Sequence, residues 1–65
     1  MVKKEAEKFM PQAERKAIFL ALVQAQDGGA SVADSRKLIG KQFVVSKQTV
    51  RRVEREGLDH GWPPL

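Results

Sequence analysis

The 65-residue chain contains no cysteine and a single histidine. Without cysteine there is no disulfide framework and no thiolate ligand for a metal ion. One histidine alone is a poor basis for a structural zinc site. We therefore expect neither a metal nor any other cofactor.

Long apolar segments are also missing. The longest run, residues 17–23, is seven residues, whereas a membrane-spanning helix needs about 20. The first residues lack the apolar core of a signal peptide. We expect no membrane partner and a cytoplasmic location, in a bacterium or a phage.

Catalytic groups do not converge in the sequence. His60 has Asp59 beside it, but a triad also needs a serine in a water-excluding cleft, and a domain this small has little room for one. Glu54 and Glu56 would point to different sides of a helix. Residues 27–29 lack the Gly-Lys-Ser/Thr of a phosphate loop. We expect neither enzymatic activity nor a small-molecule ligand.

Positive charge is concentrated in one part of the chain. Residues 31–57 hold seven basic and three acidic side chains, while the rest holds five of each, so the whole net charge of +4 lies there. Such a local excess is typical of a phosphate-binding surface. Small proteins are often basic, so a solvated charged face is the alternative interpretation.

A small three-helix, all-α domain is predicted for residues 11–65. Proline suits the first position of a helix, serines are good N-caps, and glycines end helices. These signals place helices at about 11–26, 32–43 and 46–57, after a flexible or weakly helical arm at 1–10. Paired prolines predict an extended, stiff tail over 58–65.

The segment 46–57 has two distinct faces. Val50 and Val53 form a narrow apolar stripe that can pack on a core. The opposite face is cationic and carries an amide, which is what reading a DNA major groove requires. Its residues are Lys47, Gln48, Arg51, Arg52 and Arg55. This segment is predicted to be a recognition helix.

Residues 45–53, Val-Ser-Lys-Gln-Thr-Val-Arg-Arg-Val, are similar to the helix-turn-helix of lac-repressor-type bacterial regulators. That family shows Val-Ser-x-x-Thr-Val-x-x-Val, with a small residue five positions earlier, here Gly40. The resemblance covers about residues 34–56. It departs at Val44, where the family usually has glycine. A β-branched residue resists the left-handed conformation, so we expect a longer preceding helix or a differently opened turn.

The resemblance implies base contacts from Lys47, Gln48 and Arg52. It also matches Ser46 and Thr49 to positions that contact phosphate or seat the helix on the DNA backbone. Chemically, an amide can pair with adenine, and a cationic side chain can donate to guanine.

Three further basic residues, Arg51, Arg55 and Lys41, are expected to contact phosphates without reading sequence. The alternative is a salt-bridged solvent face along the helix. Arg51 with Glu54, and Arg52 with Glu56, have the (i, i+3) and (i, i+4) spacings that permit such pairs. Exposed pairs of this kind are worth little.

The run 17–23 covers nearly every direction of a helix, whereas one core needs only a stripe. Its second face can meet the C-terminal tail or a second subunit, and a homodimer would suit two DNA half-sites. Trp62 is either a buried anchor or part of a docking peptide, Trp-Pro-Pro-Leu. The candidate protein-interface residues are Phe19, Leu20, Val23 and Trp62.

Together these features predict a sequence-specific binder of double-stranded DNA, acting as a small transcriptional or mobile-element regulator. The alternative is an adaptor that recruits a larger nucleoprotein complex through helix 11–26 and the Trp-Pro-Pro-Leu tail.

Overall fold

The computed structural model describes residues 10–65 of the chain, so the expected N-terminal arm lies outside the described residues except for Met10. Within this range the protein is all-helical, with three helices and no strand. The helices are α2 (Gln12–Asp27), α3 (Val32–Phe43) and α4 (Lys47–His60). The prediction of an all-α fold is confirmed for this part of the chain.

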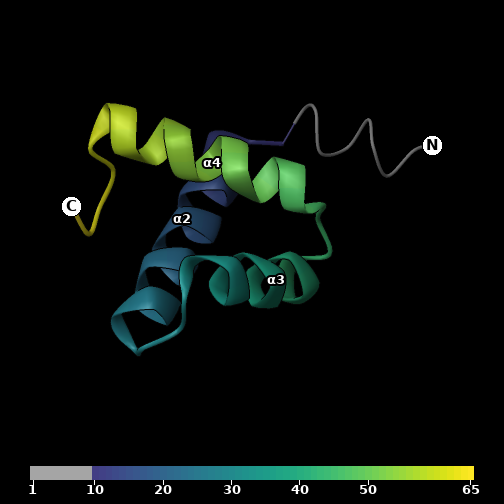
Figure 1. Ribbon diagram of the computed structural model, residues 1–65. Coiled ribbons are helices and arrows are strands. Elements are labelled where there is room, and N and C mark those ends of the chain that lie inside the picture. Colours follow the sequence, from purple (N-terminus) through teal and green to yellow (C-terminus); the bar gives the residue numbers. More distant parts are fainter. Residues whose placement is uncertain (1–9) are drawn as a thin grey trace.

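The three helices pack against one another in every pairing. In Figure 1, α2 passes steeply behind α4, and α3 lies below α4, joined to it by a short turn. No helix in the described range is long and apolar enough to cross a lipid bilayer.

The core lies between the three helices and is closed by residues at both ends of the described chain. Its buried apolar members are Met10, Ile18, Phe19, Leu22, Ile39, Val50, Val53 and Trp62. Ser35 is buried among them, and its hydroxyl accepts from Gln26 Nε2 (3.1 Å) and donates to the Val32 carbonyl (2.8 Å). This polar group therefore enters the core with its hydrogen bonds made.

Helix α3 begins with a side-chain cap and ends in a left-handed turn. Ser31 Oγ accepts from the Asp34 amide at 3.1 Å, which satisfies one unpaired donor of the first turn. Val44 follows the helix with φ 56° and ψ 51°. The amides of Val45 and Val44 donate back to the carbonyls of Gly40 and Lys41. This is the Schellman arrangement.

The left-handed Val44 corrects the expectation that valine would lengthen the helix or open the turn. The helix ends at Phe43, and Val44 takes the conformation that its β-branched side chain disfavours. The side chain is 60% exposed, so it meets few neighbours. The two hydrogen bonds of the turn and the packing of α4 hold the strained backbone in place.

Gly40 is buried at the same turn. A Cβ built on it would lie 3.1 Å from the carbonyl oxygen of Val45, tighter than ordinary contact. The small residue therefore lets the chain fold back over the last turn of α3.

Helix α4 continues beyond its expected end. Gly57 lies inside the helix, and Gly61, with φ 64°, is the left-handed residue that follows it. Leu58, the next residue, is exposed. Packing explains the glycine at 57, because the ring of Phe19 lies against it where a side chain would start. Residue 57 must therefore be small, and it does not end the helix.

The C-terminal tail turns back onto the core, where an extended tail was expected. The Trp62 amide donates to the Gly57 carbonyl, and the Leu65 amide donates to the Trp62 carbonyl, each at 3.0 Å. The Trp62 ring is 5% exposed. It meets Phe19 edge to face, with centroids 6.2 Å apart.

A candidate nucleic-acid interface

The outer face of α4 carries the polar residues singled out in the sequence. At 100° per residue, Val50, Val53 and Gly57 share one side of the helix, and all three are buried. Thr49 is half-buried, and the other predicted base-contacting and phosphate-contacting side chains of this helix are exposed: Lys47, Gln48, Arg51, Arg52 and Arg55. The fold therefore presents one cationic, amide-bearing face to solvent.

Ser46 and Thr49 fix the start of this helix. Ser46 Oγ accepts from the Thr49 amide at 3.2 Å and donates to Thr49 Oγ1 at 3.1 Å. This is the N-cap expected from the sequence. It determines where α4 begins, and so which residues fall on its outer face.

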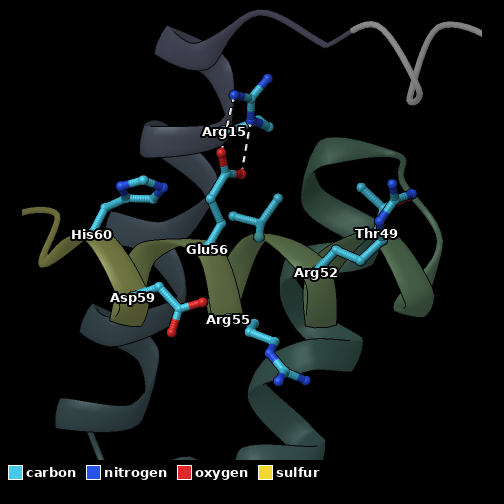
Figure 2. A pocket seen from close by; sticks show the side chains of 8 residues that line it. Arg15, Thr49, Arg52, Arg55, Glu56, Asp59 and His60 are labelled. Atoms are coloured by element: carbon cyan, nitrogen blue, oxygen red, sulfur yellow. Dashed lines mark hydrogen bonds and ion pairs between the residues drawn. The ribbon is translucent and has the colours of Figure 1, made fainter.

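Glu56 on α4 is bound by an arginine from another helix. Arg15 on α2 donates from Nε to Oε1 at 3.0 Å and from Nη2 to Oε2 at 3.1 Å. Figure 2 shows this pair as two dashed lines on the α2 side of α4. Such a two-point contact fixes both side chains, and it is stronger than a neutral hydrogen bond.

Glu54 is bound in a similar way by Arg36 on α3. Both Nε and Nη2 of Arg36 donate to Glu54 Oε1, at 3.0 and 2.9 Å. The Glu54 side chain is 17% exposed. The two glutamates of α4 therefore each join α4 to a different helix.

The alternative pairs within α4 are not formed. Arg51 does not bind Glu54, and Arg52 does not bind Glu56. Among residues 10–65, no ion pair engages Arg51, Arg52 or Arg55. The two glutamates of α4 are thus directed toward its neighbouring helices, whereas Asp59 is exposed and lines the first pocket with Arg52 and Arg55.

Two pockets flank the outer face of α4, and Arg52 and Arg55 line both. The first, shown in Figure 2, is lined by Arg15, Thr49, Arg52, Val53, Arg55, Glu56, Asp59 and His60. The second is lined by Arg36, Gln48, Arg51, Arg52, Glu54, Arg55 and Leu58. Arg52 and Arg55 thus form a cationic ridge between two hollows.

Three predicted contact residues lie outside these pockets: Lys41, Lys47 and the N-cap Ser46. Lys47 is exposed at the first position of α4, and Lys41 is exposed near the end of α3. The pockets also contain residues that sequence analysis did not select, of which Arg15 and Arg36 are the most consequential. Their partners lie 41 and 18 positions away, so no local pattern could have revealed them.

The candidate protein-interface residues separate into two groups. Phe19 and Trp62 are buried in the core, and Val23 is half-buried against it. Leu20, at 40% exposure, is the member of this set that faces solvent.

No protein-family model matches this sequence. No match was found among curated proteins or among solved structures. Within residues 10–65, no group of three or more His, Cys, Asp or Glu side chains could hold a metal ion.

Proposed function

We propose that the protein binds double-stranded DNA, with α3 and α4 acting as a helix-turn-helix and α4 entering the major groove. The main support for this proposal is the outer face of α4, where Arg51, Arg52 and Arg55 are exposed and have no ion pair among residues 10–65. Exposed guanidinium groups without an ion pair can bind phosphates or the acceptor atoms of guanine.

Local geometry supports this proposal. The turn between α3 and α4 is short, requires a small residue at Gly40, and has Val44 in the left-handed conformation. A tight turn of this kind before a capped, cationic helix is the arrangement that helix-turn-helix proteins use to present a helix to DNA.

Roles for the individual side chains follow from their positions. Lys47 and Gln48 lie in the first turn of α4, and Arg52 lies about one turn further along, so these three would contact bases. The remaining polar residues of α4 and the turn, together with one lysine of α3, would contact phosphates: Ser46, Thr49, Arg51, Arg55 and Lys41. A role as a transcriptional or mobile-element regulator, as a homodimer on two half-sites, is part of this proposal.

An adaptor role through α2 and the Trp-Pro-Pro-Leu tail has less support. Phe19 and Trp62 are committed to the core, so they offer little surface to a partner. Leu20 and the exposed tail residues 63–65 remain, which is a small contact area for a stable protein complex.

The proposal is tested by fluorescence anisotropy with a mixed-sequence DNA duplex at several salt concentrations. For a handful of phosphate contacts, log affinity should fall linearly with log salt, with a slope of roughly −3 to −6. Arg52→Gln should weaken binding and reduce the steepness of the slope by about one. Flat, weak binding that Arg52→Gln does not change would refute the proposal.

Lys16→Gln is the matched control. Lys16 is exposed on α2 beside the Trp62 ring, with its Nζ 5.8 Å from the ring centroid, and it lines neither pocket. The substitution removes the same unit of charge away from the α4 face. Circular dichroism of each variant should show that the helices are retained.

A further inference from the structure

Glu56 has two arginines within reach and is bound to one of them. Arg52 lies four residues earlier on the same helix, a spacing that ordinarily permits an ion pair. Arg15, Arg52 and Glu56 all line the first pocket. In the structure, both carboxylate oxygens of Glu56 are bound by Arg15, and Arg52 is left open to solvent.

The contact with Arg15 is pre-organised from the α2 side. Arg15 Nη1 also donates to the carbonyl of Met10, so the guanidinium group is held at a third point. The side chains of Arg15 and Glu56 are 30% and 31% exposed, which shields the pair in part from salt. The exposed Arg52 must order its flexible side chain to compete for the same carboxylate.

We infer that Arg15 is a positioning residue for DNA binding, which holds Glu56 away from Arg52 so that Arg52 can bind DNA. This inference rests on the proposed function. Arg36 acts on Glu54 in the same way and keeps it from Arg51, three residues earlier on α4. Arg15 on α2 and Arg36 on α3 thereby leave the arginines of α4 free of its glutamates, although α4 is the helix that enters the groove.

The consequence of removing Arg15 follows from the spacing. In Arg15→Gln, Glu56 loses both of its hydrogen bonds, and Arg52, four residues earlier on the same helix, has the spacing that permits an ion pair with it. Binding DNA then requires Arg52 to exchange this carboxylate for an acceptor atom of the DNA. The loss of one cationic contact with DNA corresponds to roughly a five- to tenfold lower affinity at about 0.1 M salt.

The test compares four variants with the wild type by the same anisotropy titration. Arg15→Gln should weaken binding by roughly five- to tenfold and reduce the salt slope by about one. Lys16→Gln has the same net charge as Arg15→Gln and should stay within about twofold of the wild type. Arg15→Gln/Glu56→Gln should recover to within about twofold of the wild type, because no carboxylate remains to bind Arg52.

The fourth variant, Arg15→Gln/Glu14→Gln, separates this mechanism from a general effect of charge. It has the same net charge as the recovered variant, but it keeps Glu56 and removes an exposed carboxylate of α2. It should bind as weakly as Arg15→Gln. Recovery in this variant, or equal affinity of Arg15→Gln and Lys16→Gln, would overturn the inference.

A purely structural role, or a direct contact of Arg15 with DNA, predicts a different pattern. Either would leave Arg15→Gln/Glu56→Gln as weak as Arg15→Gln, because both variants lack the α2–α4 ion pair and both lack the Arg15 guanidinium group. Thermal unfolding measured alongside should show similar melting temperatures for these two variants.

If the wild type shows no salt-dependent binding, the proposed function itself fails. If the wild type binds and Arg52→Gln weakens it, a failure of the Arg15 series concerns this inference alone.

Discussion

Phe19 and Gly57 are in direct contact where α2 crosses α4. A Cβ atom at residue 57 would lie 2.3 Å from Cδ1 and 2.6 Å from Cγ of the Phe19 ring. Phe19 is fully buried, and its ring also packs edge to face with that of Trp62. This contact sets how closely the two helices approach, and it explains a glycine in the interior of α4.

Replacing Gly57 with alanine is expected to destabilise the protein. Alanine is the better helix former by about 1 kcal/mol, but its methyl group would displace the buried Phe19 ring. Overpacking of this kind costs about 1–3 kcal/mol. Thermal or urea unfolding followed by circular dichroism should show a lower free energy of unfolding.

The control for this substitution is Gly28→Ala. A Cβ at residue 28 meets two carbonyl oxygens at an ordinary 3.5 Å, and its φ of −78° suits any residue. This variant should unfold close to the wild type. Phe19→Leu/Gly57→Ala should lose less than the sum of its two single substitutions. Strict additivity would contradict the proposed contact.

Val44→Gly is expected to stabilise the protein. The left-handed conformation costs a β-branched residue about 1–2 kcal/mol, and glycine adopts it freely. The exposed Val44 side chain contributes little packing, and the greater freedom of glycine in the unfolded chain offsets part of the gain. The net increase in the free energy of unfolding should be about 0.5–1 kcal/mol. Val32→Gly, at an exposed position inside α3, should show no such gain.

Trp62→Leu should lower stability by about 1–3 kcal/mol. The variant loses the edge-to-face contact with Phe19 and the stacking of His60, whose ring lies 6.0 Å from that of Trp62. Leu65→Ala, at an exposed neighbouring position, should change the free energy of unfolding by no more than about 0.5 kcal/mol. Denaturant unfolding checks both, and equal effects would contradict a structural role for the Trp62 ring.

Gln48→Ala and Arg55→Ala should separate base reading from phosphate binding. If Gln48 reads a base, its loss should narrow the affinity difference between preferred and unrelated duplexes, with an effect of about 1–3 kcal/mol at one base pair. Arg55→Ala should weaken binding to all duplexes alike and reduce the salt slope by about one. Once a preferred site has been selected, competition titrations measure both effects. A uniform loss in Gln48→Ala would remove it from the base-reading set.

The local features of this fold could be inferred from the sequence. The caps of Ser31 and Ser46 involve amides three residues away, so short patterns contain them in full. The two faces of α4 follow from helical periodicity, which places Val50 and Val53 opposite the arginines. The sequence by itself thus determined the helices and the cationic face.

Tertiary structure decided the features that join distant residues. Glu56 pairs with Arg15 across 41 positions, and nothing near residue 56 distinguishes this from a pair with Arg52. Gly57 lies against the Phe19 ring, which permits only a small residue there, so this glycine serves packing and α4 ends at the left-handed Gly61. Val44 keeps a conformation that its own side chain disfavours, because the turn and the packing of α4 outweigh the strain. In each case several local outcomes have similar free energies, and contacts between helices select one of them.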